Sequence, residues 1–278
     1  DPCVLPLLEK GLELLSEDEP VSFSSVAWVL LSPGVPPTHP LVQRALSCRL
    51  EVIGEVEFAL RRLFNPCVGV TGSSGKTTTT LLAEHILQTH KIPARALGNV
   101  GRPLSAYLSS PYSQEILILE LSSFQLETLS SRRLRAALIL NIMPNHLDRY
   151  SSMQEYAAAK LRIASCLMEG GEFFVSSQAR QYARFGTVFA TSPSLSQTEQ
   201  AAFRLCQIFG LSSSDCLQAA ASFQRPPHRL EWVAEKNGVA YYNDSKATSV
   251  DAVIYAVNSL PGPIILLAGG QDKGAPYA

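Results

Sequence analysis

The stretch GSSGKTTTT, which begins at Gly72, limits the possible folds of this chain more than any other feature. The apolar run NPCVGV precedes it, and the helix-like run TTTTLLAEHILQTHK follows it. In this order of strand, glycine loop and helix, backbone N–H groups and the helix N-terminus face phosphate oxygens. The first glycine of the full Walker pattern is missing, since that position is Val70. The remaining Gly-x-x-Gly-Lys-Thr still predicts nucleotide binding, with Lys76 near the outer phosphates and Thr77 offering its hydroxyl to Mg²⁺.

Two later runs, EILILEL at 115–121 and AALILNI at 136–142, are almost entirely apolar. Such unbroken apolar sequences are typical of parallel strands that are covered on both faces of a sheet. Polar residues end or follow each run, namely Glu120 with SSFQ in the first case and Asn141 with PNHLDR in the second. The carboxyl ends of parallel strands form the ligand crevice of an open sheet. We therefore expect Lys76, Glu120 and His146 to converge on one site.

The rest of the pattern predicts further α/β structure. Between residues 23 and 54 we expect a strand, a Ser-Pro-Gly turn, a helix opened by Pro40 and a second strand. Helices are predicted over 154–171, with a glycine stop, and over 198–210, and a serine-rich loop over about 178–200. The prolines of RPPHR mark a boundary, after which strands are predicted at 238–244 and 263–270 with a helix between them.

Composition argues against several classes of function. The net charge is −1 and no long run of lysine or arginine occurs, so a nucleic-acid partner is not expected. The six cysteines are scattered without a Cys-x-x-Cys pair, which predicts reduced core thiols in a cytoplasmic protein. The longest apolar stretches are strand-sized, so no membrane span is predicted.

Several single residues allow two interpretations. Glu120 is either a metal ligand or the partner of an arginine or a helix dipole. A lone histidine such as His146 is more often structural than functional, and on pattern alone Lys160 is a solvated surface lysine. Asp244 or Ser245 is equally suited to capping a helix as to binding a ligand, and GGQDKG is compatible with a turn.

A series of motifs along the chain resembles the Mur ligase family. In order, they are SPGV with a following HP, GSSGKTT, GNVG, LELSSFQLE, NHLDRY, AAKLRI, PHRLE, NDSKAT and GGQDKG. The loop GSSGKTT is shared by all Mur ligases and folylpolyglutamate synthetases. ELSSFQLE and NDSKAT discriminate between branches, because the sibling ligases have an Asp-x-x-His type motif in place of NDSKAT. The resemblance covers nearly the whole chain and is strongest to the branch that adds D-glutamate.

The resemblance implies an ATP-dependent amide ligase of peptidoglycan precursor synthesis. In the family, ATP phosphorylates the carboxylate of UDP-N-acetylmuramoyl-L-alanine. The amine of D-glutamate then attacks the acyl phosphate, and phosphate leaves. A carboxylate is a poor electrophile until its oxygen becomes a good leaving group, and Mg²⁺ screens the repulsion between the anions. The resemblance implies ATP and two Mg²⁺ ions, small-molecule substrates and a monomer.

The resemblance also implies roles for the matching residues. Nucleotide contacts are implied for Gly72, Ser73, Ser74, Gly75, Lys76, Thr77, Thr78, Arg229 and Asp244. Contacts to the UDP-linked substrate are implied for Ser32, Pro33, Gly34, Asn99, Ser122, Gln125 and His146, and contacts near D-glutamate for Lys246, Thr248 and Lys273. Metal ligation is implied for Thr77, Glu120, His146 and Lys160, and catalysis for Lys76, His146 and Lys160. Lys160 is carbamylated in the family, which turns a cation into an anionic oxygen ligand.

Three α/β domains with parallel sheets are expected, with a P-loop ATPase domain at the centre. They are a UDP-substrate domain at 1–64, an ATP-binding domain at 65–225 and the start of a Rossmann-like amino-acid domain at 226–278. Compared with the family, the outer domains are incomplete in this sequence. The Gly-x-His-Asn segment that touches adenine in the family has no counterpart near SPSLSQTEQ.

Two alternative functions remain at the level of sequence. One is a sibling ligase or a folylpolyglutamate-type ligase, against which SPGV and NDSKAT argue. The other is a P-loop nucleotide switch. A GTPase switch should contain Asn-Lys-x-Asp, which is missing, and a Walker-B aspartate where this chain has Glu120.

Overall fold

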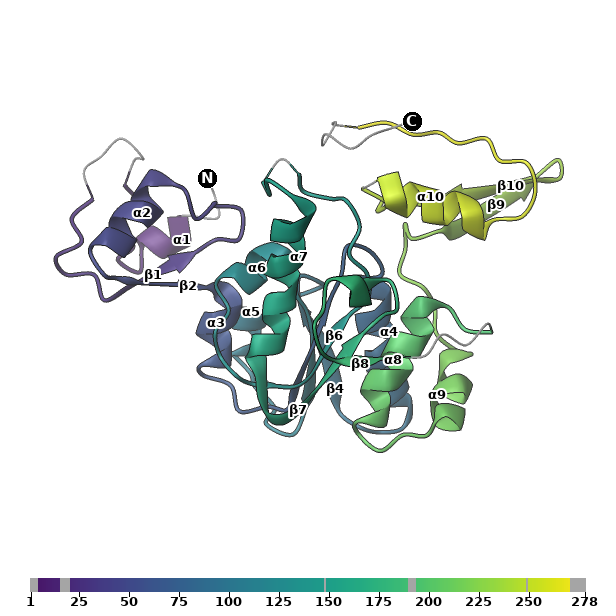
Figure 1. Ribbon diagram of the computed structural model, residues 1–278, viewed down its shortest axis with the longest axis horizontal. Coiled ribbons are helices and arrows are strands. Elements are labelled where there is room, and N and C mark those ends of the chain that lie inside the picture. Colours follow the sequence, from purple (N-terminus) through teal and green to yellow (C-terminus); the bar gives the residue numbers. More distant parts are fainter. Residues whose placement is uncertain (1–4, 16–20, 148, 190–193, 249, 271–278) are drawn as a thin grey trace.

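The computed structural model of the chain describes residues 5–15, 21–147, 149–189, 194–248 and 250–270. Figure 1 shows a large central unit with two smaller units above it, the N-terminal one on the left and the C-terminal one on the right. None of the described helices combines the length and apolar character that a membrane crossing requires.

The N-terminal unit contains α1 (Leu5–Leu8) and two parallel strands, β1 (Trp28–Leu31) and β2 (Glu51–Gly54), joined through α2 (Pro40–Ser47). Pro40 opens α2 because its fixed φ suits the first helical turn, and the His39 ring accepts a hydrogen bond from the backbone N–H of Leu41. The predicted order of strand, turn, helix and strand is confirmed.

The central unit is built on a six-stranded sheet whose described strands run parallel in the order β4-β5-β3-β6-β7-β8. The strands are β3 (Cys67–Thr71), β4 (Ala94–Gly98), β5 (Ile116–Glu120), β6 (Leu134–Ile139), β7 (Leu167–Val175) and β8 (Thr187–Val188). β3 and β5 are buried along their whole length, which explains their continuous apolar sequences. The glycine loop therefore leaves the sheet from an interior strand, between β5, which ends in Glu120, and β6, which Asn141 follows two residues after its end.

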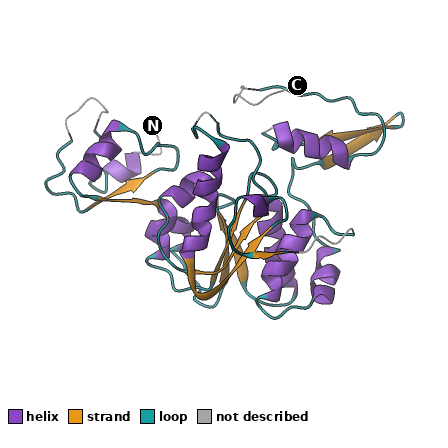
Figure 2. Ribbon diagram, in the orientation of Figure 1, coloured by secondary structure: helices purple, strands orange, loops and turns teal. Residues whose placement is uncertain are grey.

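Helices cover both faces of this sheet, as Figure 2 shows. One face carries α3 (Glu55–Leu60), α5 (Leu104–Tyr107), α6 (Ser123–Glu127) and α7 (Met153–Leu161). The other carries α4 (Lys76–Thr89), α8 (Gln197–Gln207) and α9 (Ser213–Ala220). Each face has its own apolar core, so the doubly covered sheet holds the carboxyl ends of its strands in fixed positions.

The helix predicted over 154–171 is wrong in its second half. α7 ends at Leu161, a 3₁₀ turn covers Arg162–Cys166, and β7 begins at Leu167 and pairs with β6. A Cβ on Gly171 would lie 3.0 Å from the Leu134 carbonyl oxygen, so this glycine permits close strand approach and does not end a helix. The loop predicted over about 178–200 also contains a 3₁₀ turn, Ala179–Gln181, and β8.

The C-terminal unit contains the antiparallel strands β9 (Glu231–Lys236) and β10 (Val239–Asn243), followed by α10 (Val250–Ser259). Asn237 and Gly238 both have positive φ, which is the geometry of an Asn-Gly hairpin turn. The strand predicted at 263–270 is wrong: the segment is a loop in Figure 2, and Leu267 is 94% exposed. A strand needs a hydrogen-bonded neighbour, and the described residues place none beside this apolar run.

Candidate functional site

Residues at the carboxyl end of the central sheet and residues of the C-terminal unit together line a cavity of about 300 Å³. Lys76, Glu120 and His146 all line it, so the expected convergence of these three residues is confirmed. The C-terminal unit contributes Arg229, Leu230, Asp244, Lys246, Ala247, Thr248, Ala252, Tyr255 and Ala256 to its wall. The site is therefore assembled from segments more than a hundred residues apart in sequence.

The glycine loop bends between β3 and α4. Gly75, the N-cap of α4, has φ 80°, and Gly72 has φ 156°. A Cβ added to Gly72 would lie 2.9 Å from the Leu140 Cβ. A side chain at either position is strained, which explains why glycine occupies both. The loop thus leaves the N-terminus of α4 open to the cavity, in the arrangement that binds phosphate through backbone N–H groups.

The Lys76 side chain folds back over the loop. Its Nζ donates to the Gly72 carbonyl at 2.9 Å and to the Ser73 carbonyl at 3.2 Å. Burial lowers the pKa of Lys76, while the Glu120 carboxylate acts in the opposite direction. The ammonium is held at the phosphate-binding loop by carbonyls that it can exchange for phosphate oxygens.

Asn141, which follows β6 and which the sequence did not assign to the site, braces the glycine loop. Its carbonyl accepts from Ser73 N at 3.0 Å, and its side-chain Oδ1 accepts from Ser74 N at 2.8 Å. Its Nδ2 donates to the Ser74 carbonyl and to Gln197 Oε1, both at 3.2 Å. This amide thereby joins the loop to the first residue of α8.

Asn141→Ala is expected to weaken nucleotide binding by about tenfold, because the Ser74 amide groups lose their partner and the loop loses a fixed shape. Asn141→Asp should weaken it further, since a carboxylate then faces the phosphates. Calorimetric titration with ATP measures both affinities. Equal affinities for wild type and both variants would contradict a bracing role.

Glu120 ends β5 and is 2% exposed. Its Oε1 accepts from the Asn99 Nδ2 at 2.8 Å, so its neighbour is an amide and not the arginine considered from sequence. Its Oε2 is buried without a hydrogen-bond partner among the described residues. A buried carboxylate oxygen is costly unless it is paired, and this one lies at the wall of a polar cavity, which favours a cation there.

His146 lies in the loop after β6 and has the left-handed φ of 56°. Its backbone N–H donates to Asn145 Oδ1 at 3.0 Å. Its ring packs edge-on against the Phe124 ring, with the two ring centroids 4.8 Å apart. The left-handed conformation is uncommon for a residue with a Cβ and is held here by the surrounding turn. The ring reaches the cavity from a backbone position that the sequence does not reveal.

The interpretation of Lys160 as a solvated surface lysine is wrong. The residue is 2% exposed, and its Nζ donates to the Gly72 carbonyl at 2.9 Å, the same oxygen that Lys76 contacts. Burial lowers the pKa of Lys160 well below its usual value, and the neighbouring Lys76 charge lowers it further. Two ammonium groups on one carbonyl repel each other, so the site favours a neutral amine at Lys160.

The C-terminal unit reaches the loop through Arg229, whose guanidinium donates to Thr77 Oγ1 at 2.8 Å. Asp244 Oδ1 accepts from Leu230 N at 2.9 Å, and α10 begins only at Val250. The helix-cap interpretation of Asp244 is therefore wrong, because this carboxylate fixes the chain next to Arg229. For Ser245 it is wrong as well, since its N–H donates to Asn243 Oδ1 at 3.1 Å before the helix starts.

Other predicted residues lie apart from the cavity or outside the description. The Ser32-Pro33-Gly34 turn follows β1 in the N-terminal unit, and Ser122 and Gln125 form the capping box of α6. None of these is among the cavity-lining residues, whereas Lys246 and Thr248 are. Lys273 falls outside the described residues.

The charge of the cavity wall suits an anion. Among the lining residues that the structure describes, four cationic side chains, Lys76, Arg225, Arg229 and Lys246, face two carboxylates, Glu120 and Asp244. Four lining residues were not expected at the site, namely Arg225, Asn145, Thr198 and Tyr255. Asn145 lies within the motif NHLDRY but had no implied role, and none of the family motifs includes the other three. A surplus of positive charge at the N-terminus of α4 is what a triphosphate requires.

Comparison with known proteins gives the context of this site. Residues 70–201 match the Mur ligase middle domain. The chain is 39% identical to the UDP-N-acetylmuramoylalanine–D-glutamate ligase of Protochlamydia amoebophila, over 99% of this chain and 70% of the relative. It is 38% identical to the ligase of the same name from Desulfovibrio desulfuricans, over 98% and 67%. It thus spans about two thirds of these relatives' length.

A similar fold occurs in the solved structure of MurF ligase from Thermotoga maritima in complex with ADP. The TM-score is 0.55 at 18% identity, over 81% of this chain and 69% of that one. At this identity the likeness concerns the fold alone.

Proposed function

This chain belongs to the Mur ligase family, and on that basis we propose that it is an ATP-dependent ligase that joins D-glutamate to UDP-N-acetylmuramoyl-L-alanine in peptidoglycan precursor synthesis. The names of its relatives point to this reaction. The observation that carries the proposal is the shared cavity, where the glycine loop, a buried carboxylate and a cationic wall from a second unit meet. A ligase that activates a carboxylate with ATP needs these elements in one place.

The proposed reaction has two steps. A carboxylate oxygen of the UDP-linked substrate attacks the γ-phosphorus of ATP. The bond between this phosphorus and the oxygen that bridges it to the β-phosphate breaks, and ADP leaves. The neutral amine of D-glutamate then attacks the acyl carbon, phosphate leaves, and the amine loses a proton. The phosphoryl oxygens carry the developing charge, and fixed cations such as Lys76 and Arg229 stabilise it.

Each unit has a proposed task in this reaction. The loop residues 72–78 bind the phosphates, with Arg229 and Asp244 closing over them from the C-terminal unit. Lys246 and Thr248 lie on the same wall and are proposed, with Lys273, to receive D-glutamate. The Ser32-Pro33-Gly34 turn, Asn99, Ser122 and Gln125 are proposed to bind the UDP-linked substrate.

Magnesium fits part of this donor set. The partnerless Glu120 Oε2 is a suitable hard oxygen ligand, whereas Thr77 Oγ1 already accepts from Arg229. No three His, Cys, Asp or Glu side chains in the described part of the chain gather into a metal site, so phosphate oxygens would have to complete the coordination. Glu120 and His146 are proposed ligands, together with Thr77 through the second lone pair of its hydroxyl oxygen and Lys160 once it is carbamylated. A bound Mg²⁺ would neutralise charge on the phosphates.

Carbamylation of Lys160 is part of the proposal. A neutral amine adds to CO₂, the new N–C bond forms, and one proton leaves, which gives an anionic carbamate. Burial and the Lys76 charge both favour the neutral amine that this reaction needs. The product would place an anion that attracts the Lys76 ammonium where the neutral amine had been. We further propose that the protein acts as a monomer in the cytoplasm.

The direct test is phosphate release by the full-length protein with ATP, Mg²⁺ and UDP-N-acetylmuramoyl-L-alanine. Parallel wells contain D-glutamate, L-glutamate, L-lysine, meso-diaminopimelate or no amino acid. We expect release that needs both the UDP-linked substrate and D-glutamate. Release with another amino acid would make the protein a sibling ligase, and no release in any well, with ATP still bound, would favour a nucleotide switch.

A further inference from the structure

Arg149 lies in the same turn as His146 but is not among the described residues that line the cavity. The backbone N–H groups of Arg149 and Tyr150 both donate to the His146 carbonyl at 3.0 Å, so the position of this turn also sets the position of the histidine. No motif role was expected for Arg149. Its side chain extends toward the N-terminal unit.

The guanidinium of Arg149 makes three contacts, one to the Ser32-Pro33-Gly34 turn and two to α6. One Nη donates to the Pro33 carbonyl at 3.0 Å, and the other donates to Glu127 Oε2 at 2.5 Å. The guanidinium carbon also lies 4.1 Å from the centroid of the Phe124 ring. The Arg149 and Glu127 side chains are only 14% and 16% exposed.

The same groups lead back to the cavity. The Phe124 ring has Arg149 on one side and meets the His146 ring at 4.8 Å. Glu127 is held at its other oxygen by the Tyr150 hydroxyl, which donates to Oε1 at 2.6 Å. Tyr150 is itself buried in the core of the central unit. A movement of the Pro33 carbonyl therefore acts on side chains that pack directly against His146.

The planar fork of arginine is suited to this task. Its separate N–H groups bind a carbonyl and a carboxylate at once while its face stacks on an aromatic ring. A lysine has one compact ammonium group and cannot reproduce all three contacts. The charge-assisted bond to Glu127 is largely shielded from water, so it directs the fork toward Pro33.

We propose that Arg149 is a positioning residue that sets the Ser32-Pro33-Gly34 turn relative to His146 and the phosphate-binding cavity. This inference rests on the proposed function, in which that turn binds the uridine diphosphate and the cavity receives the substrate carboxylate. Arg149 thereby fixes the distance between the two ends of one substrate. Its loss should affect the UDP-linked substrate and leave ATP binding intact.

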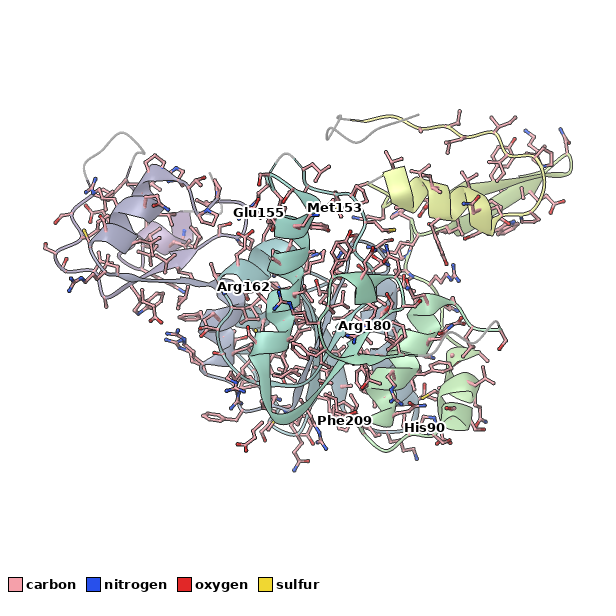
Figure 3. All side chains as sticks on the ribbon, viewed as in Figure 1. His90, Met153, Glu155, Arg162, Arg180 and Phe209 are labelled. Carbon is pink, nitrogen blue, oxygen red and sulfur yellow. The ribbon has the colours of Figure 1, made fainter. Side chains whose placement is uncertain are left out.

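The test compares Arg149→Ala and Arg149→Lys with the control Arg162→Ala in the full-length protein. Arg162, labelled in Figure 3 at the end of α7, donates to the Leu126 and Leu129 carbonyls at 2.8 and 3.5 Å. It thus supports α6 as Arg149 does, without reaching the N-terminal turn. Steady-state kinetics give kcat and the KM of each substrate, and amide hydrogen exchange follows residues 28–35.

Arg149→Ala is expected to raise the KM of the UDP-linked substrate about tenfold or more, with the KM of ATP within about twofold of wild type. Hydrogen exchange over 28–35 should become faster. Arg149→Lys should recover only part of both effects, and Arg162→Ala should show neither. An unchanged KM for the UDP-linked substrate, or equal losses in Arg149→Ala and Arg162→Ala, would overturn the proposal.

The exchange measurement keeps this inference separate from the proposed function. If the wild-type protein fails to use D-glutamate, the proposed function is wrong, and hydrogen exchange over 28–35 still shows whether Arg149 holds the turn. If the wild type is active and exchange over 28–35 is the same in all variants, the positioning role is wrong while the function stands.

Discussion

Lys76→Ala is expected to lower kcat/KM for ATP on the order of a thousandfold. Lys76 is the cation of the glycine loop, and its ammonium is held by the Gly72 and Ser73 carbonyls, next to the N-terminus of α4. In phosphoryl transfer the fixed cation stabilises charge that develops on the phosphate oxygens, and removing one such donor costs about 10²–10³ in rate. Loss of initial phosphate binding adds to this effect.

Phosphate-release kinetics with varied ATP measure the loss, and calorimetry with the UDP-linked substrate measures what is retained. Binding of that substrate should stay within about twofold of wild type, because the proposed uridine site lies in a different unit. Lys91→Asn is the matched control: Lys91 is exposed just beyond the other end of α4 and has φ 60°, which asparagine tolerates. Loss of both ligands in Lys76→Ala would point to misfolding, and full ATP turnover would remove Lys76 from the site.

Sequence reasoning located the site because local rules dominate there. Glycines at 72 and 75 are required by backbone geometry, and the apolar runs at 115–121 and 136–142 have no other stable place than a doubly covered sheet. Once these strands are parallel, Lys76, Glu120 and His146 must lie at the same edge. None of these steps needs information about distant contacts.

Elsewhere, pairing between distant segments decided the structure. The segment LMEGGEFFV follows a helical run almost directly, yet its pairing with β6 makes it a strand. Gly170 has φ 74°, and this glycine suits a bend within the strand as well as the end of a helix, so the sequence did not distinguish the two. The run at 263–270 has strand composition but no partner among the described strands. Composition sets what a segment prefers, whereas backbone hydrogen bonds from elsewhere decide what it becomes.

The roles of Asn141, Arg149 and Lys160 were hidden for a related reason. The side chain of each bonds to a backbone carbonyl or amide of another segment. Residues of any type have such backbone groups, so the sequence does not indicate which of them will be the partner. Lys160 has the spacing of an ordinary helix residue, and only the packing of α7 against the sheet turns it toward Gly72. The family resemblance supplied a role for Lys160, while nothing in the pattern did so for Arg149.

Lys160→Ala is expected to reduce ligase activity about a hundredfold or more, because the proposed carbamate oxygen that holds a metal is lost. Added bicarbonate should not restore the variant, since it has no amine to carbamylate. A small carboxylate such as acetate should restore part of the activity by entering the space that the side chain leaves, next to the Gly72 carbonyl. Phosphate release at increasing acetate concentration measures the rescue.

Two further observations separate a carbamate from a merely structural lysine. With ¹³C-labelled bicarbonate, wild-type protein should show a carbamate carbon signal that Lys160→Ala lacks. Wild-type activity should also fall when CO₂ is removed at acidic pH, since carbamates release CO₂ on protonation. Because the pKa of Lys160 is lowered, its neutral amine is available at pH values well below those that an ordinary lysine requires. Activity should therefore recover when CO₂ is returned, without strongly basic pH. A fully active Lys160→Ala protein would show that the reaction does not need Lys160 at all. An active wild type without a carbamate signal would show that the unmodified amine is sufficient.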